Sequence, residues 1–154
     1  MKKVVIGSDH GGYELKEEIA AFLRKEGYEV SDYGCYSSDP VDYPDIALLV
    51  AEAVSGSTGL DDTVGIMVDG VGIASAMVGN KIPGVRAAYC WDIFTARSSR
   101  EHNNANMLTL GGRVTGGELA KSIVKTWLET DFAGGRHIRR VDKIMDIERR
   151  FLRR

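Results

Sequence analysis

The sequence predicts an α/β protein in which helices cover both faces of a parallel β-sheet. Five short runs of apolar or β-branched residues alternate along the chain with longer segments that keep helical spacing. Two of these runs are apolar throughout, which is typical of strands buried on both faces of a sheet. Strands that alternate with helices are joined by right-handed crossovers, and such crossovers make the sheet parallel.

The individual elements follow from the same pattern, taken from the N-terminus onward. The expected strands cover residues 4–7, 28–33, 64–68, 85–90 and 107–111. Helical spacing joins residues in three of the intervening segments: Leu15, Ile19, Phe22 and Leu23; Ile46, Leu49, Val50, Ala53 and Val54; and Leu119, Ile123, Thr126 and Trp127. Pro44 suits a first helical turn, and Asp92 suits a helix N-cap.

Length and composition indicate one globular domain. The chain has 154 residues, of which 44% are hydrophobic and 27% charged, and it holds no low-complexity tract. The first residues lead directly into a strand-like run, so we expect no signal peptide, no membrane span and a cytoplasmic location. Cys35 and Cys90 are too few and too isolated for a disulfide framework or a zinc site, which favours reduced, buried thiols.

The charge of the chain is nearly balanced but unevenly distributed. A formal net charge of −2 argues against a general nucleic-acid or membrane partner. Residues 136–154 are basic, whereas residues 39–62 are acidic. The C-terminal stretch is therefore compatible with a local anion site.

Polar residues follow four of the five expected strands. In open sheets of this kind, ligands bind beyond the carboxyl ends of the strands, and this edge collects whatever comes next in the sequence. Here the edge is expected to collect Asp9, His10, Asp69, Gly70, Gly72, Asp92, Gly112 and Arg113. The sequence therefore predicts a polar site at this edge.

The first two of these stretches each have a structural and a functional interpretation. In SDHGG (residues 8–12), Asp9 is either a helix cap or a sugar-hydroxyl or anion contact, and His10 is either a surface residue or part of the same site. DGVGIAS (residues 69–75) places backbone N–H groups at the start of a helix, which suits a phosphate or a developing oxyanion.

A dinucleotide site is a weak alternative for DGVGIAS. Ser75 stands where the dinucleotide fingerprint requires a third glycine or alanine, and the Asp69 carboxylate would repel a pyrophosphate. Asp92 nevertheless lies at roughly the distance of a ribose-binding acid. Acids after alternate strands also suit a magnesium-dependent phosphoacceptor module, but the fifth strand ends in Gly-Gly-Arg where such a module places its lysine.

The remaining histidines lie in REHNNAN (residues 100–106) and GGRHIRR (residues 134–140), where surface positions are the ordinary interpretation. Arg136 and Arg140 are four residues apart and share one face if a helix begins there. Two guanidinium groups on one face form a good phosphate clamp. The alternative is a solvated basic face that pairs with Asp142 and Asp146.

Taken together, SDHGG, VDYPD, DGVGIASAMVGNKIPGVRAA, REHNNAN, LGGRVTG and FAGGRHIRRV resemble the ribose-5-phosphate isomerase type B family, which also holds the galactose-6-phosphate isomerase subunits. The resemblance covers residues 3 to about 145. It implies a Rossmann-like three-layer sandwich with a five-stranded parallel sheet and no metal or organic cofactor. It also implies a homodimer or dimer of dimers with active sites shared between subunits, and a C-terminal helix, about residues 137–152, that packs on a partner subunit.

The resemblance also implies roles for individual residues in an aldose–ketose isomerisation of a sugar phosphate. It assigns Asp9 and His10 to sugar and phosphate contacts, and it places Tyr43 near the substrate. His102 is the implied acid/base of ring opening, and Asn103 contacts the sugar and the oxyanion. The loop glycines Gly70 and Gly72 stabilise the enediolate, while Arg136 and Arg140, with Arg113 as a helper, hold the phosphate.

The loop departs from the family pattern at three positions. Family members commonly read C-G-T-G, with the cysteine as the base, or use a glutamate four residues further on. This chain has Asp69, Val71 and Ala74 at the corresponding positions. One subunit type of the galactose-6-phosphate isomerase also lacks the cysteine, which leaves a non-catalytic or partner-dependent sugar-phosphate-binding subunit as the alternative function.

Asp69 is our candidate for the base that replaces the thiolate. The helix N-terminus behind the loop lowers the proton affinity of such a carboxylate, whereas burial and the nearby Asp9 raise it. Val71 removes a hydroxyl donor from the expected pocket, so we expect a shifted preference, toward a deoxy or differently configured sugar phosphate.

Overall fold

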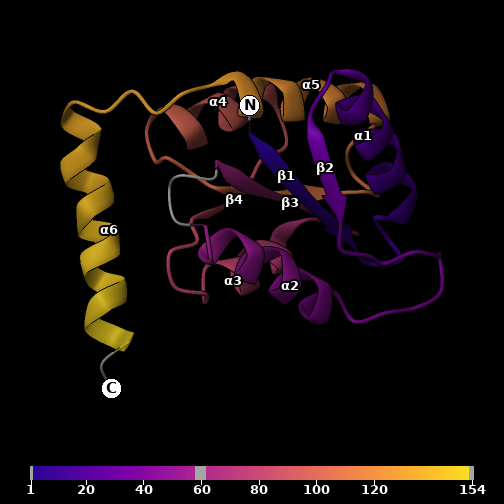
Figure 1. The fold of residues 1–154 in the computed structure, drawn as a ribbon, viewed down its shortest axis with the longest axis horizontal. Helices are drawn as coiled ribbons and strands as arrows, with labels where there is room; N and C mark the ends of the chain where they lie inside the picture. Colours follow the sequence, from indigo (N-terminus) through magenta and orange to yellow (C-terminus); the bar gives the residue numbers. More distant parts are fainter. Residues whose placement is uncertain (1, 58–61, 153–154) are drawn as a thin grey trace.

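The computed structural model describes residues 2–57 and 62–152, and these form a five-stranded parallel sheet between two layers of helices (Figure 1). Across the sheet the strands run in the order β2-β1-β3-β5-β4. Their bounds are β1 Lys3–Ser8, β2 Glu29–Asp32, β3 Thr63–Asp69, β4 Ala87–Tyr89 and β5 Met107–Gly111. Every neighbouring pair is parallel. The predicted α/β class and three-layer sandwich are therefore confirmed.

The helices divide between the two faces of the sheet. Helices α1 (Tyr13–Lys25), α4 (Ile93–Glu101) and α5 (Gly117–Glu129) cover one face, and α2 (Tyr43–Ser55) and α3 (Ile73–Gly79) cover the other (Figure 1). Successive strand residues point to opposite faces. Accordingly, Val4 and Ile6 of β1 join the core under α1 and α5, while Val5 joins the core under α2.

Two helix-boundary expectations are confirmed, and two strands are shorter than expected. Pro44 lies in the first turn of α2, where its missing N–H costs nothing. The Asp92 side chain caps α4 by accepting a hydrogen bond from the Thr95 N–H at 2.7 Å. The second strand covers Glu29–Asp32 of the expected residues 28–33, and the fourth covers Ala87–Tyr89 of residues 85–90; both are edge strands with one hydrogen-bonded neighbour.

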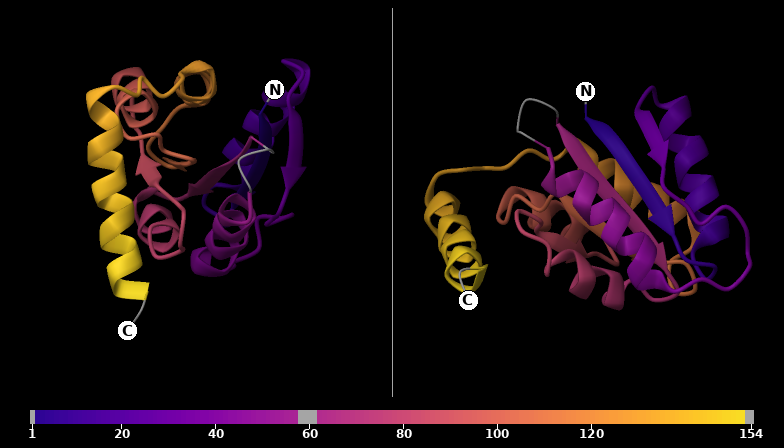
Figure 2. Two further views of the ribbon diagram at one scale, coloured as in Figure 1. Left: turned by 60° about the vertical axis from the view of Figure 1, so that its left-hand side comes forward. Right: turned by 60° about the horizontal axis from the view of Figure 1, so that its bottom comes forward.

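The C-terminal helix α6 (Arg136–Leu152) stands beside the rest of the domain (Figures 1 and 2). Residues 130–134, which have no helix or strand, lead to it. Val141 is its only buried residue in the described part of the helix. Large apolar side chains that remain about half exposed are Ile138, Ile144, Ile147, Phe151 and Leu152. An apolar face of this size is typical of a protein interface.

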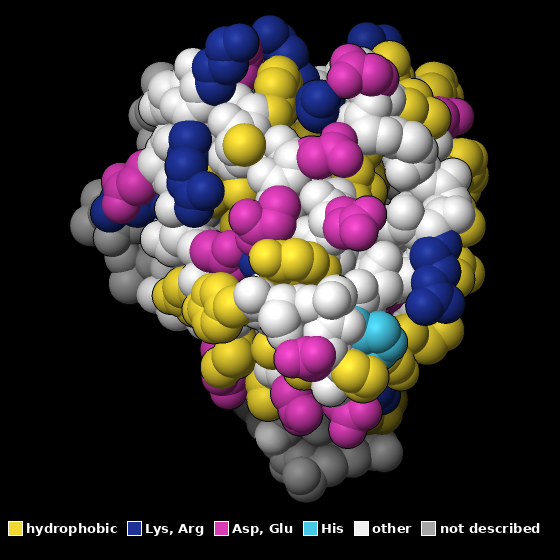
Figure 3. Space-filling model, turned by 90° about the vertical axis from the view of Figure 1, so that its right-hand side faces the viewer, with side chains coloured by type: hydrophobic (Ala, Val, Ile, Leu, Met, Phe, Trp, Pro, Cys, Tyr) yellow, Lys and Arg dark blue, Asp and Glu magenta, His cyan; other side chains and the backbone are white. Residues whose placement is uncertain are grey.

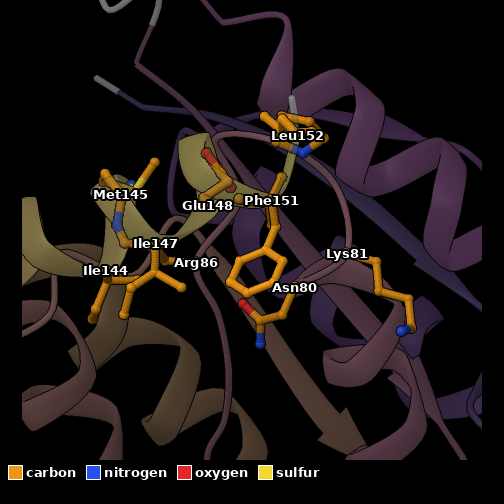
Figure 4. A pocket seen from close by; sticks show the side chains of 11 residues that line it. Asn80, Lys81, Arg86, Ile144, Met145, Ile147, Glu148, Phe151 and Leu152 are labelled. Carbon is orange, nitrogen blue, oxygen red and sulfur yellow. The ribbon is translucent and has the colours of Figure 1, made fainter. Parts of the chain in front are cut away.

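A groove of about 490 Å³ runs between α6 and residues 80–86 (Figure 4). Phe151 and Ile144 reach into it from α6, and Asn80 and Arg86 line it from the body of the domain. The described hydrogen bonds across the groove are few: the Gly84 N–H donates to Glu148 Oε1 at 3.0 Å, and Arg86 Nη1 donates to Met145 Sδ at 3.4 Å.

None of the helices in the described residues has the length and apolarity to cross a bilayer.

Lys16 is a fully buried cation that joins α1 to the end of β2. Its Nζ donates to Asp32 Oδ2 and to the Cys35 carbonyl, both at 2.7 Å, and lies 3.0 Å from Glu17 Oε1. Burial lowers the pKa of Lys16, but the hydrogen bonds and charges of Asp32 and Glu17 outweigh it and hold the pKa above its ordinary value. The Lys16 ammonium therefore stays charged inside the protein.

We expect Lys16→Met to destabilise the fold by about 3 kcal/mol, because it leaves the partly buried Asp32 carboxylate without its cation. Lys125→Met is the matched control: its ion pair with Glu26 is about half exposed, so the loss should be below about 1 kcal/mol. Urea unfolding of both variants measures the two values. Equal losses would show that Lys16 contributes no more than a surface lysine.

Candidate active site

The carboxyl ends of β1 and β3 bring two acids together. The chain leaves β1 for β2 on one side of the sheet and then returns past β1 to β3, which makes this pair of strand ends the topological switch point. Asp9 directly follows β1, and Asp69 is the last residue of β3. The Asp9 N–H donates to the Val68 carbonyl at 3.2 Å, which joins the two strand ends. The polar edge predicted from the sequence is therefore present here.

A cavity of about 400 Å³ opens beside these acids. Its lining is apolar apart from the acids and a tyrosine and consists of Asp9, Tyr43, Asp69, Gly70, Val71, Ile73, Ala74 and Met77. The Arg113 N–H donates to the Gly70 carbonyl at 3.0 Å, and the Arg113 side chain lies over Gly70. The structure thus brings Tyr43 and all residues of the predicted edge except Asp92 to one rim: Asp9, His10, Tyr43, Asp69, Gly70, Gly72, Gly112 and Arg113.

The Asp69 carboxylate is turned back onto its own loop. Its Oδ1 accepts hydrogen bonds from the N–H groups of Val71, at 2.8 Å, and Gly72. Its Oδ2 accepts from the Ser75 N–H at 3.1 Å and from Ser75 Oγ at 2.5 Å. Asp69 and Ser75 are both buried. The loop amides, which the sequence predicted to bind an external anion, therefore hold the negative charge of Asp69 in this conformation.

Gly72 gives the loop its shape. Its φ of 95° lies in the left-handed region that favours glycine, and it forms the N-cap of α3. A Cβ on Gly72 would lie 2.7 Å from the Leu110 carbonyl carbon and 2.8 Å from the Tyr89 ring. Any other residue would therefore displace the loop from β5 and open the ring of amides around Asp69.

The residues after β1 combine a local structural role with a place at the rim. Asp9 Oδ1 accepts a hydrogen bond from the Gly12 N–H at 3.1 Å, but Gly12 is itself the N-cap of α1 and no side chain caps that helix, so the interpretation of Asp9 as the helix cap is wrong. His10 Nδ1 accepts from the Val41 N–H at 3.2 Å, which ties the segment before α2 to the rim. Because Nδ1 is the acceptor, a neutral His10 carries its proton on Nε2, a donor suited to a hydroxyl or an anion.

A second group of predicted residues lies elsewhere. His102 ends α4 and stacks on His137, with ring centroids 4.4 Å apart and 15° between the ring planes. Asn103 is exposed next to His102, and its Nδ2 donates to the Ser98 carbonyl at 3.4 Å. Arg136 and Arg140 are exposed in the first two turns of α6. Helix α6 thus begins at Arg136, so the two guanidinium groups share one face as predicted.

These two groups lie at opposite ends of the sheet, so one chain does not bring them to a common rim. His102 precedes β5, whereas Arg113 follows it, and β5 is five residues long. At about 3.3 Å per residue, the strand alone separates the two ends by about 13 Å. His102, Asn103, Arg136 and Arg140 therefore cannot contact a small ligand that lies against Asp69 of the same chain.

Figure 3 shows the side of the molecule toward α1 and the segment before α2. Acidic side chains occupy the centre of this face, and the basic ones lie toward its margins. Among the three arginines predicted to hold the phosphate, Arg113 alone belongs to the rim.

The dinucleotide-binding alternative from the sequence loses its support. Asp92 is used as the α4 cap, and hydrogen bonds from the Thr95 backbone and side chain lower its pKa, so it does not serve as a ribose-binding acid. Cys35 and Cys90 are both buried, as expected, and burial raises the pKa of Cys90. Across residues 2–57 and 62–152, no three His, Cys, Asp or Glu side chains are grouped as a metal site would require.

Comparison with known proteins identifies the family. The family model for Ribose/Galactose Isomerase matches residues 4–144. The chain belongs to this isomerase family. Ribose-5-phosphate isomerase B of Escherichia coli (strain K12) is 45% identical over 150 residues, which are 97% of this chain and 99% of that protein. D-erythrulose-4-phosphate isomerase of Pectobacterium atrosepticum is 39% identical over 94% of this chain and 93% of its own.

The fold of this isomerase is shared by solved structures of the same family. Ribose-5-phosphate isomerase B of Clostridium thermocellum superimposes with a TM-score of 0.92 at 54% identity, covering 97% of this chain and 99% of that chain. The chain is therefore a sugar-phosphate isomerase of the ribose/galactose isomerase family, an aldose–ketose isomerase.

Two residues of the isomerase were not singled out from the sequence. Ser75 binds the Asp69 carboxylate twice, although the sequence showed it only as a departure from a glycine pattern. His137 stacks on His102 although 34 intervening residues separate them in the chain. Neither contact has a signal in residue spacing, because each depends on how a loop or a distant helix places one side chain.

Proposed function

We propose that this isomerase interconverts the aldose and ketose forms of ribose 5-phosphate or a related small sugar phosphate through an enediolate. Relatives named for a five-carbon and a four-carbon sugar phosphate support this substrate class. The observation that carries the proposal is the cavity at the switch point, which Asp69 and the amide-rich loop border. Isomerisation requires a base and oxyanion donors at one carbon, and this loop provides both types of group.

The second group of residues completes the site from another subunit. His102 acts as acid/base in opening the sugar ring, Asn103 contacts the sugar, and Arg136 and Arg140 hold the phosphate. Within one chain these residues lie about 13 Å or more from the rim, so a partner must supply them. The acidic face near the rim and the basic start of α6 are complementary in charge.

A homodimer, or a dimer of dimers, gives each site both halves. The half-exposed apolar residues of α6 supply the surface for this association, because a stable interface needs an apolar centre. We propose that α6 of each chain packs on its partner and carries the arginines to the partner's rim. A two-fold axis then creates two equivalent sites per pair.

Asp69 is the proposed base, and its geometry sets a condition for that role. All four lone-pair positions of the carboxylate accept hydrogen bonds from Val71, Gly72 and Ser75 in the free enzyme. To take a proton from the sugar, Asp69 must leave the loop. The freed amides then bind the enediolate oxygen in place of the carboxylate, so one negative charge replaces another.

A second candidate function is a sugar-phosphate-binding subunit that is inactive by itself. The observation that favours it is the same ring of hydrogen bonds around Asp69, because a carboxylate that stays in place blocks the oxyanion donors.

Val71 affects which substrate fits, whichever of the two functions is correct. It lines the cavity at the position of the threonine in the resembled C-G-T-G pattern, so we propose a weaker fit for a sugar whose hydroxyl would meet that position.

Asp69→Asn and Asp69→Cys distinguish the two candidates. We expect Asp69→Asn to lower kcat by about 100-fold or more, since it keeps the shape but removes the base. Asp69→Cys should restore turnover with the acid limb of kcat at higher pH, because a thiol of pKa about 8.5 loses its thiolate as pH falls. The assay is proton exchange at C2 in deuterated water across tetrose, pentose and hexose phosphates.

Asp92→Asn is the matched control for these variants, because Asp92 also ends a strand–helix loop but only caps α4. Its turnover should stay within twofold of the wild type. Loss of the cap lowers the stability of the fold by about 1 kcal/mol but removes no group from the site. Near wild-type turnover of Asp69→Asn would reject the base. An inert wild type combined with an active Asp69→Cys variant would establish the non-catalytic subunit.

Mixing two inactive variants tests whether the sites are shared. Asp9→Asn disables the rim, and His102→Asn disables the other half-site. After joint unfolding and refolding, random pairing makes half of the dimers mixed, and each mixed dimer has one intact site, so about a quarter of wild-type activity should return. The same variants refolded separately are the controls. No recovery on mixing would contradict a site built from two chains.

A further inference from the structure

His137 is placed against His102 by the turn that begins α6. Gly134 and Gly135 have φ values of 66° and 54°, and the His137 N–H donates to the Gly134 carbonyl at 3.0 Å. This turn directs the His137 ring back onto α4, where it lies 4.4 Å from the His102 ring at 15° between planes. Helix α6 makes few other contacts with its own chain, so the stack is one of its main attachments.

The His102 ring is held on an edge and on a face. Its Nδ1 lies 3.3 Å from Ser98 Oγ, one turn back on α4, and His137 covers the ring face. These contacts fix both the rotation and the tilt of the imidazole. With Nδ1 engaged by Ser98, Nε2 is the nitrogen presented to a ligand.

The charges around the stack disfavour a second proton. Burial, then His102, then Arg136 and Arg140 lower the pKa of His137, and Glu101 opposes them weakly. The groups that face His137 are thus His102 and Glu101 from α4 and the two arginines from its own helix. A positive charge on the His102 ring therefore disfavours a proton on His137.

We propose that His137 is a positioning residue for His102: its ring, stacked on the His102 imidazole, holds that imidazole in the orientation needed for ring opening. The assignment of ring opening to His102 rests on the proposed function. The stack itself does not. His137 therefore acts through His102 and not by contact with the reacting carbon.

The stack predicts different effects on cyclic and on open-chain substrates. A tetrose 4-phosphate has its O4 blocked by phosphate and cannot close a furanose ring, so it needs no ring opening. We expect His137→Ala to lower kcat for ribose 5-phosphate by about tenfold or more, since small misplacements of a catalytic group have effects of this size. Turnover of erythrose 4-phosphate should change by less than twofold, and KM should hardly change for either sugar.

Two further variants control this experiment. His137→Phe keeps a planar ring over His102 and should retain most of the ribose 5-phosphate turnover. Arg139→Ala removes an exposed neighbour on α6 that has no place in the site, and it should change neither rate. An equal loss of His137→Ala turnover on both sugars, or no loss on ribose 5-phosphate, would overturn the positioning role.

Proton coupling is measured separately, by NMR titration of the three histidines in the full-length protein. In His102→Asn the midpoint of His137 should rise by about half a pH unit or more, because a neighbouring positive charge is removed. An unchanged His137 midpoint would refute the coupling. If the wild type isomerises neither sugar, the proposed function fails, whereas this titration still decides whether the pair exists.

Discussion

The structure of this isomerase depends on how one negative charge is held at the switch point of the sheet. Asp69 ends a buried strand, and a loop with left-handed Gly72 folds its amides around the carboxylate. A buried charge needs such partners, because an unpaired carboxylate would be strongly disfavoured there. The same amides are the donors that an enediolate requires. The loop can therefore satisfy Asp69 or an oxyanion at any one time, and the proposed mechanism requires an exchange between them.

The second constraint is the distance between the two halves of the site. A parallel sheet fixes the direction of every strand, so groups that precede a strand and groups that follow it lie at opposite ends. His102 and the arginines of α6 are kept from Asp9 and Asp69 of their own chain by the length of β5. The acidic face, the basic helix start and the apolar helix face are consistent with the proposed arrangement, in which pairing of chains would build the site.

Much of this could be predicted from the sequence. The strands, the α4 cap at Asp92, Pro44 in the first turn of α2 and the polar rim follow from periodicity and local chemistry, which act over a few residues. The position of His102 was also within reach, since a residue before a strand lies at the amino end of the sheet. The direction of the Asp69 carboxylate and the stack of His137 were not, because each depends on the tertiary placement of a single side chain.

The most direct test of the account is a crystal structure of the enzyme bound to a phosphorylated hydroxamic acid that mimics the enediolate. We predict that the hydroxamate oxygen occupies the loop amides, that Asp69 has turned from Ser75 toward the reacting carbon, and that Arg136 and Arg140 of the second chain hold the phosphate. A mimic bound with Asp69 still on its own loop, or with its phosphate held by one chain alone, would contradict the account.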